Sequence, residues 1–310
     1  MLTAAVIGLG AMGCNHARVY AQMPDVRLIA VCDSDSNKLG SITRTWGATA
    51  YDDYTLLLAR EKPDVVSVCV PTSAHLRIAS TCILAGCHVL VEKPITSTLE
   101  TAKMLINLAQ QERHILAVGH IERCNPIVTA VKHHIDNGDI GTGYRISTRR
   151  VGPSPVRIRD VGVTLDLLTH DLDVARYLLQ AEPVTYHAEM LQAKHGNYDD
   201  AVTAIVRFEN DVIGAFEADW LSSAKERTLT VTGSEGVIMA DYLSQTAVIA
   251  FEPSERVKIG TLYEEPLLVE LRSFVAAVRG EGRPAATGDD GLQALAMATR
   301  ILESAKSGQN

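Results

Sequence analysis

The sequence predicts an α/β protein of two domains, a doubly wound parallel sheet followed by an α+β domain with an open, mostly antiparallel sheet. Short apolar runs alternate with amphipathic helical stretches through the first 120 residues, and a glycine-rich turn follows the first run. Beyond that point, strands follow one another with few helices between them. The 310-residue chain is long enough to bury two cores. We therefore expect domains at residues 1–120 and 121–310.

The strands of the first domain are expected where the chain is continuously apolar and rich in β-branched residues, a pattern typical of strands buried on both faces. These runs are Ala4–Ile7, Val26–Cys32, Val65–Val70, His88–Val91 and Ile115–Val118. The helices between them are predicted at Ala11–Gln22, Ala74–Ala85 and Leu99–Gln111. Ligands of such sheets bind at the carboxyl ends of the strands, so the residues after each run are candidates for a site.

The second domain is expected to place helices against one face of its sheet. Its helices are predicted at Pro126–Ile135, Val163–Leu179, Leu267–Val278 and Leu292–Ala305. Its strands are predicted at Tyr144–Val151, Ala201–Phe208, Val212–Trp220, Thr228–Thr232 and Ala247–Phe251. Polar and apolar residues alternate strictly in Thr228–Thr232, as they do in a sheet with one buried face.

The charge balance argues against nucleic acid as a partner. With 29 basic and 37 acidic residues the formal net charge is −8, and no Lys/Arg block interleaves with aromatic residues. No run approaches the ~18 uncharged apolar residues of a membrane span. The apolar start of the chain has neither a basic leader nor a cleavage site. We expect a soluble, cytoplasmic protein.

The cysteine pattern predicts reduced thiols. All six cysteines lie within the first 124 residues, and no two form a C-x-x-C pair. Cys32 and Cys69 lie in strand-like runs, where a thiol behaves as a small apolar group. Cys14, beside the glycine turn, is the one candidate for a reactive thiol. No metal site is expected.

A glycine fingerprint, G-x-G-x-x-G, joins the first strand to the first helix. Gly8 permits the tight turn, Gly10 lets the backbone approach a pyrophosphate, and Gly13 allows the helix to pack closely on the strand. The helix N-terminus supplies N–H donors and the positive end of its dipole. The predicted cofactor contacts of this turn are Gly8, Gly10, Ala11, Met12 and Gly13.

Asp33 follows Gly13 by 20 residues, at the end of the second predicted strand. A carboxylate there can accept both hydroxyls of the adenosine ribose and repel a 2′-phosphate, which favours NAD over NADP. The alternative is a structural glycine turn with a solvated aspartate. The strand before the turn, the helix after it and the position of Asp33 favour the dinucleotide site.

Further polar residues follow later strands of the first domain. Thr72 and His75 follow Val65–Val70, where Thr72 could contact the cofactor and His75 could be a ligand or a structural histidine at a helix start. Glu92 and Lys93 end the next strand, because Pro94 removes a ladder donor and favours an extended backbone before it. Lys93 in isolation is typical of a solvated lysine, but its place on the ligand edge indicates a functional role.

Asp166 and His170 lie in an otherwise apolar predicted helix of the second domain. A four-residue spacing puts both side chains on one helix face. In isolation this is typical of a helix face with a hydrogen-bonded histidine. The neighbouring Asp171 and Asp173 are expected to be solvated or structural.

These motifs together resemble the glucose–fructose oxidoreductase/inositol dehydrogenase (Gfo/Idh/MocA) family over essentially the whole chain. The resemblance implies a Rossmann domain and assigns Lys93, Asp166 and His170 as the catalytic group. It implies cofactor contacts from Thr72, His75, Lys93 and Glu92, the last to the nicotinamide-side ribose. It also implies a homodimer or homotetramer formed through the open sheet of the second domain.

Two segments resemble a subgroup of that family that acts on nucleotide sugars, including UDP-N-acetylglucosamine. Gly119–Pro126 is similar to its G-H-x-E-R-F-N-P segment, although Cys124 stands where an aromatic residue is expected. The stretch from Arg157 to Val163 is similar to the same members. Arg123, Asn125 and Arg157 are therefore candidate substrate contacts, and a surface or domain-interface role is the alternative for each.

The expected function is the NAD-dependent oxidation of a secondary hydroxyl on a sugar, with a nucleotide sugar such as UDP-N-acetylglucosamine as the favoured substrate. Two alternatives within the resemblance are an inositol or simple sugar dehydrogenase and a redox-neutral glycosidase that retains NAD. A cofactor-binding protein without catalysis is a third alternative. The complete set of Lys93, Asp166 and His170 argues against that last function.

Overall fold

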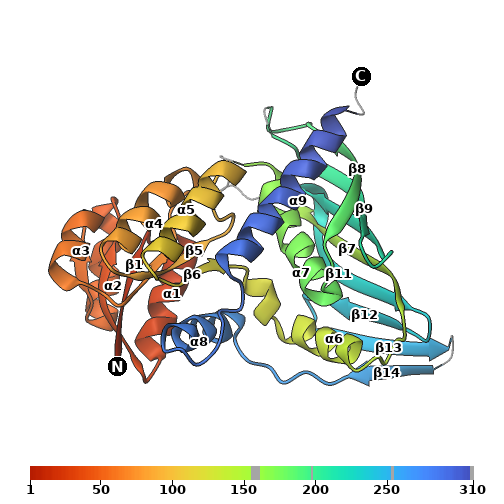
Figure 1. Ribbon diagram of the computed structural model, residues 1–310, viewed down its shortest axis with the longest axis horizontal. Coiled ribbons are helices and arrows are strands. Elements are labelled where there is room, and N and C mark those ends of the chain that lie inside the picture. Colours follow the sequence, from red (N-terminus) through yellow and green to blue (C-terminus); the bar gives the residue numbers. More distant parts are fainter. Residues whose placement is uncertain (155–160, 197, 253–254, 308–310) are drawn as a thin grey trace. The chain divides into compact units, whose positions relative to one another are not determined.

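The computed structural model describes residues 1–154, 161–196, 198–252 and 255–307, with the side chains of all of these except 40–44 and 252 (Figure 1). The chain forms two compact units. Unit 1 contains Met1–Ile121 and Glu265–Leu292, and unit 2 contains Glu122–Glu264 and Gln293–Asn310.

This division differs from the expected boundary at residue 120, because residues 265–292 return to the first unit. The cause is helix α8 (Pro266–Val278), whose apolar face is buried in the same core as the first strand and the first helix. Leu271 and Phe274 have no exposed surface there. Burial of that face stabilises unit 1 with a segment that is distant in sequence.

Unit 1 is a parallel sheet wound in both directions from its centre. Within the described residues its six strands have the order β3-β2-β1-β4-β5-β6. They are β1 (Leu2–Ile7), β2 (Val26–Cys32), β3 (Thr49–Tyr51), β4 (Val65–Val68), β5 (His88–Glu92) and β6 (Leu116–Gly119). Every neighbouring pair is parallel. The predicted doubly wound fold is confirmed, and β1 and β4 form its switch point.

Helices connect these strands in the figure's left-hand part (Figure 1). They are α1 (Ala11–Gln22), α2 (Ser36–Trp46), α3 (Tyr54–Glu61), α4 (His75–Leu84) and α5 (Leu99–Gln111), with a short 3₁₀ turn η1 (Thr72–Ala74) before α4. Since parallel crossovers are right-handed, the reversal of strand order puts α1 and α2 on one face and α4 and α5 on the other.

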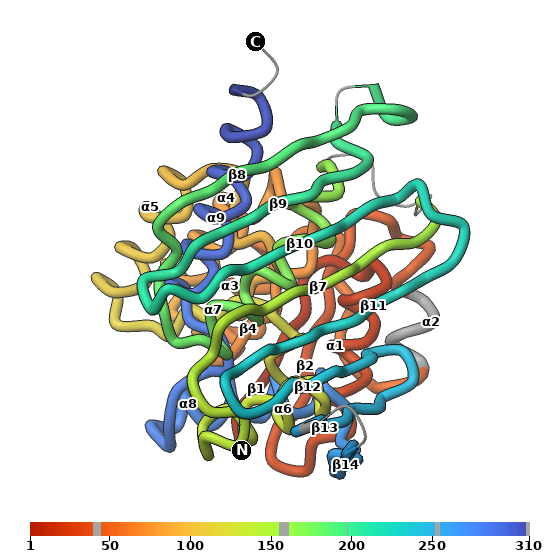
Figure 2. The backbone as a smooth tube through the Cα atoms, turned by 90° about the vertical axis from the view of Figure 1, so that its right-hand side faces the viewer, coloured from red at the N-terminus to blue at the C-terminus, as the bar shows by residue number. Residues whose placement is uncertain are grey.

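Unit 2 contains a mixed sheet that Figure 2 shows face-on, with its strands side by side. Among the described residues, eight strands have the order β14-β13-β12-β11-β7-β10-β9-β8. They are β7 (Gly143–Pro153), β8 (Pro183–Leu191), β9 (Ala201–Phe208), β10 (Ile213–Asp219), β11 (Leu221–Gly233), β12 (Val237–Asp241), β13 (Thr246–Glu252) and β14 (Glu255–Ile259). Only the pairing of β7 with β10 is parallel among these strands. The predicted open, mostly antiparallel sheet is confirmed.

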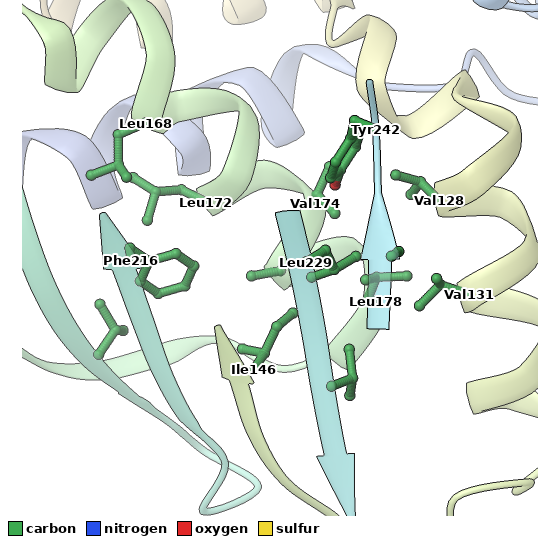
Figure 3. Packing of buried hydrophobic residues seen from close by; sticks show 14 of the residues in the cluster. Val128, Val131, Ile146, Leu168, Leu172, Val174, Leu178, Phe216, Leu229 and Tyr242 are labelled. Atoms are coloured by element: carbon green, nitrogen blue, oxygen red, sulfur yellow. The ribbon is translucent and has the colours of Figure 1, made fainter. Parts of the chain in front are cut away.

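Helices cover one face of this sheet and bury its core. Leu172, Val174 and Leu178 of α7 (Thr169–Leu179) pack with Phe216 and Leu229 of the strands (Figure 3). Other contributions come from α6 (Pro126–Asp136) and from the part of α9 (Gly288–Ser307) that belongs to unit 2. On β9 buried and exposed residues alternate, so the opposite sheet face is open within this chain. In the described helices, none has the length and apolarity to cross a membrane.

The helix predicted at Val163–Leu179 begins with a π-helical turn. This turn is η3 (Thr164–Leu168), and the amide of Thr169 donates to the carbonyl of Thr164, an i→i+5 bond. The carboxylate of Asp199 holds the start of the turn by accepting from the Thr164 amide at 2.7 Å and its hydroxyl at 2.6 Å. The expectation of one uniform α-helix was therefore wrong over this first turn.

Candidate active site

The glycine turn between β1 and α1 has the geometry that a dinucleotide phosphate needs. Gly8 has φ +92°, and a Cβ on it would lie 2.5 Å from the carbonyl oxygen of Cys69. A Cβ on Gly13 would lie 1.7 Å from the carbonyl oxygen of Gly8, whereas one on Gly10 would have no atom within 4 Å. Gly10 is also the N-cap of α1 and gives that end no side-chain cap. A close turn below open space at a helix N-terminus fits a pyrophosphate.

Gly13→Ala should destabilise unit 1 and abolish cofactor binding, because its Cβ would overlap the Gly8 carbonyl. Relieving such overpacking costs about 1–3 kcal/mol. Gly10→Ala is the matched control, since its Cβ would enter open space and should leave the melting temperature unchanged while hindering the pyrophosphate. Circular dichroism and calorimetric titration with NADH measure the two effects. A Gly13→Ala variant as stable as the parent chain would contradict this account of the turn.

Asp33 holds a fixed carboxylate at the end of β2. It accepts hydrogen bonds from the amides of Leu9 at 2.6 Å and Asp35 at 2.8 Å, and Lys38 Nζ lies 3.3 Å away. Burial raises the pKa of this carboxyl, but the two amide bonds and Lys38 outweigh burial and lower the pKa overall. The group is therefore ionised beside the glycine turn, as binding of ribose hydroxyls requires.

His75 is engaged by the protein itself. Its buried ring places Nδ1 2.9 Å from the carbonyl oxygen of Pro94 and Nε2 2.9 Å from that of Val70. Burial lowers its pKa, and this effect outweighs the contacts to the two carbonyl oxygens, which raise it. These contacts match the structural alternative: His75 ties the start of α4 to the segment that follows Lys93. Lys93 itself is half-buried immediately after β5, and Thr72 is half-buried at the start of η1.

Glu92 belongs to a buried hydrogen-bond chain that the sequence analysis missed. Its Oε1 lies 3.0 Å from Nε2 of His16, whose Nδ1 lies 3.0 Å from Oγ of Ser67. The hydroxyl of Tyr20 lies 3.1 Å from the same Oγ. A usable signal was present, because His16 and Tyr20 both occupy the buried face of α1.

The thiols near this chain are not activated. Burial raises the pKa of Cys14, so this residue lacks the lowered pKa of a reactive cysteine. Cys69 offers a sulfur close to His16 and Glu92, with the three ligand atoms within 4.8 Å of one another. However, burial raises the pKa of Cys69 well above its ordinary value, and His16 and Glu92 already bond to each other. His16 and Glu92 therefore form a hydrogen-bonded pair beside the Cys69 thiol.

Asp166 and His170 lie at the start of the long helical segment of unit 2. Asp166 is on η3 and His170 is the second residue of α7, and both are half-buried. The amide of Asp166 donates to the carbonyl of Gly162 at 3.0 Å. Asp199, which caps Thr164, therefore anchors the turn that carries Asp166.

A buried ionic network fastens α7 to the sheet. Arg150 donates to Glu122 at 2.8 Å and to both oxygens of Asp171, the residue after His170, at 2.9–3.1 Å. Arg123 donates through two nitrogens to Asp173, at 2.7 and 2.8 Å. Asp171 and Asp173 were expected to be either solvated or structural, and these ion pairs show that they are structural.

Two of the candidate substrate contacts, Arg123 and Asn125, bond to other parts of the protein. The guanidinium of Arg123 is buried against Asp173 and also stacks on Tyr177, at 5.2 Å from the ring centroid. Asn125 caps α6 by accepting from the amide of Ile127 at 3.1 Å. These contacts give both residues a structural role within unit 2. Arg157 lies outside the described residues.

Comparison with known proteins assigns both parts of the chain to one family. Residues 2–120 match the model described as "Oxidoreductase family, NAD-binding Rossmann fold", of the GFO/IDH/MocA type. Residues 128–239 match the GFO/IDH/MocA C-terminal domain. Together these matches cover most of the chain.

Curated relatives are similar along nearly their whole length. A UDP-N-acetylglucosamine 3-dehydrogenase of Acidithiobacillus ferrooxidans is 28% identical, over 96% of this chain and 95% of that protein. A scyllo-inositol 2-dehydrogenase (NAD(+)) of Bacillus subtilis is 30% identical, over 98% and 94%. A myo-inositol 2-dehydrogenase of Thermotoga maritima is 29% identical, over 97% and 96%.

Solved structures agree with this assignment. The structure of the Acidithiobacillus ferrooxidans UDP-N-acetylglucosamine 3-dehydrogenase has a TM-score of 0.91 at 27% identity, covering 100% of this chain and 99% of that one. A levoglucosan dehydrogenase in complex with NADH shares the fold, with a TM-score of 0.89 at 22% identity and coverage of 99% and 97%. The chain is therefore a member of the GFO/IDH/MocA oxidoreductases, a family of NAD-dependent sugar and polyol dehydrogenases.

Proposed function

We propose that this enzyme oxidises a secondary hydroxyl of a nucleotide sugar, with UDP-N-acetylglucosamine as the first candidate. The observation that carries the proposal lies in unit 1. Lys93 follows β5 at the sheet edge where the glycine turn and Asp33 also lie, so a cation accompanies the cofactor site. The similarity to the UDP-N-acetylglucosamine 3-dehydrogenase and the Gly119–Pro126 segment support the substrate class.

The proposed mechanism divides proton handling among three side chains. The chemistry that a bound NAD would supply is acceptance of the hydride. His170 accepts the hydroxyl proton, since an imidazole is a suitable base near neutral pH. Lys93 donates a hydrogen bond to the same oxygen and stabilises its developing negative charge. Its positive charge also favours the neutral, proton-accepting form of His170. Asp166 orients His170 or holds a neighbouring substrate hydroxyl.

Inositol oxidation is the second candidate function. Two inositol 2-dehydrogenases are as similar to this chain as the nucleotide-sugar enzyme is. Cys124, which is buried where the nucleotide-sugar subgroup has an aromatic residue, weakens the nucleotide-sugar assignment. A redox-neutral glycosidase that retains NAD is the third candidate, and it differs from both in releasing no NADH.

The experiment follows NADH absorbance with UDP-N-acetylglucosamine, inositols and simple aldoses, each with NAD and with NADP. We expect the highest kcat/KM with the nucleotide sugar and NAD, because Asp33 would repel a 2′-phosphate. Higher kcat/KM with a free inositol would overturn the nucleotide-sugar assignment. Cleavage of a glycoside without net NADH would identify the third function.

We also propose a cytoplasmic homodimer or homotetramer that covers the open face of the unit 2 sheet. That face exposes apolar residues such as Ile205 and Ile213. Burial of such residues between identical sheets would stabilise an oligomer. Light scattering of the purified protein should give two or four times the monomer mass of 33.5 kDa. Replacing Ile205 with Lys should shift it toward monomer, and a monomeric parent protein would refute the proposal.

A further inference from the structure

A continuous chain of polar groups crosses the interior of unit 1 from α1 to β5. It consists of Tyr20, Ser67, His16 and Glu92, joined by successive hydrogen bonds of 3.1, 3.0 and 3.0 Å. The first three have no exposed surface. Polar groups buried in this way are stable only when each finds its partner, and a satisfied network holds one arrangement of side chains.

The chemistry of Glu92 fixes the direction of these bonds. Burial raises the pKa of its carboxyl, but the hydrogen bond from His16 and the positive charges nearby together outweigh burial, so the pKa is lowered overall. An ionised carboxylate only accepts, so Nε2 of His16 donates to it. In the neutral imidazole Nδ1 then accepts from Ser67, and Ser67 accepts from Tyr20. Burial raises the pKa of Tyr20, which keeps its hydroxyl proton available as a donor.

The carboxylate of Glu92 is held from a second side by β6. Glu92 pairs with Gly119 in the parallel register, and a Cβ on Gly119 would lie 3.0 Å from the carboxyl carbon of Glu92. A side chain at position 119 would press on this carboxylate, and glycine avoids that contact. Oε1 takes the hydrogen bond from His16, and no described residue donates to Oε2. Oε2 is therefore the oxygen available to a ligand.

We propose that His16 is a positioning residue for the cofactor: it orients the Glu92 carboxylate so that Oε2 receives the hydroxyls of the nicotinamide-side ribose. Ser67 and Tyr20 in turn keep His16 in the tautomer that donates from Nε2. The inference rests on the proposed role of Glu92 as the contact to that ribose. It adds a remote set of residues that would govern how one half of the cofactor binds.

The test compares three ligands that differ at this ribose: NADH, ADP-ribose and ADP. ADP lacks the nicotinamide-side ribose, whereas the other two contain it. In His16→Leu we expect the Kd of NADH and ADP-ribose to rise about tenfold, the effect of losing one well-oriented hydrogen bond to a charged group. The Kd of ADP should stay within about twofold. His16→Gln, whose amide can still donate to Glu92, should restore most of the affinity.

Ser67→Ala provides a second variant if His16→Leu fails to fold, because it removes only one hydroxyl. It should weaken the binding of ADP-ribose more than that of ADP, but by a smaller factor than His16→Leu does, since His16 remains beside Glu92. Combining His16→Leu with Glu92→Gln should weaken ADP-ribose no further than the stronger single variant, because both act through one contact. Equal weakening of ADP and ADP-ribose, or no weakening of either, would overturn the role of His16.

These measurements use binding and need no sugar substrate. If the parent protein oxidises no sugar but His16→Leu selectively loses affinity for ADP-ribose, the dehydrogenase proposal would be refuted and the role of His16 supported. If the parent protein oxidises UDP-N-acetylglucosamine but His16→Leu binds ADP-ribose as tightly as the parent does, the dehydrogenase proposal would be supported and the role of His16 refuted. Unchanged ADP-ribose binding in Glu92→Gln would remove the ribose contact and the inference with it.

Discussion

Lys93→Met should lower kcat by about 10³-fold while NADH binds within about twofold of the parent affinity. Methionine keeps the length and the apolar stem of lysine but removes the cation. The proposed mechanism needs that cation only when negative charge develops on the substrate oxygen. Loss of a preorganised donor of this kind typically lowers kcat by about 10²–10³-fold.

Steady-state kinetics with the best substrate of the screen and titration with NADH measure the two quantities. Lys103→Met is the matched control, because Lys103 is exposed on α5. It should leave kcat and NADH affinity unchanged. If Lys93→Met keeps full turnover, Lys93 has no part in the chemistry, and the proposed division of roles with Asp166 and His170 is wrong.

Arg150→Met should lower the free energy of unfolding by about 3–5 kcal/mol, because it removes the cation from the buried carboxylate of Asp171 and the half-buried carboxylate of Glu122. Arg150 is 2% exposed and bonds to Glu122 and Asp171. Asp171 follows His170, so the same substitution loosens the attachment of α7 to the sheet. The turnover of any variant that still folds should fall as well.

Arg149→Met is the control for this prediction. Arg149 is the neighbouring residue on β7, points to the other face of the sheet and is 41% exposed. Its ion pairs with Glu217 and Glu226 are exposed, and such pairs contribute about 0–1 kcal/mol. Urea unfolding followed by circular dichroism separates the two variants. Equal stability of both would show that the buried network contributes nothing net.

The effect of Arg150→Met should also depend on pH. Burial raises the pKa of Asp171 even with Arg150 present, whereas Arg150 helps to keep the pKa of Glu122 below its ordinary value; without Arg150 both pKa values should rise. The folded variant then binds more protons than the unfolded chain, so its stability falls as pH rises. The difference in the free energy of unfolding between the parent protein and the variant should therefore be smaller at pH 5 than at pH 8.

Local patterns were sufficient where an element has a strong period and clear ends. Helices α1 and α5 have the predicted bounds, because each is amphipathic and begins after a turn or a capping residue. By contrast, β3 and α2 were missed. The strand β3 has only three residues, which is too short for a clear pattern. The helix α2 has few apolar residues, but Leu39, Ile42 and Trp46 stand at helical spacing, a signal that the sequence analysis overlooked.

The sequence by itself determined the family, the fold class, the glycine turn and the expected cofactor, because these depend on residues adjacent along the chain. Tertiary structure decided the partners of polar side chains. Arg123 and Asn125 matched a motif, yet in the described structure they bond to Asp173 and to the start of α6.

Tertiary structure also joined His16 to Glu92 across 76 residues and returned α8 to unit 1. The physical reason is the same in each case. A buried polar or apolar group must find a partner, and that partner is chosen by the packing of distant segments, which no local period records.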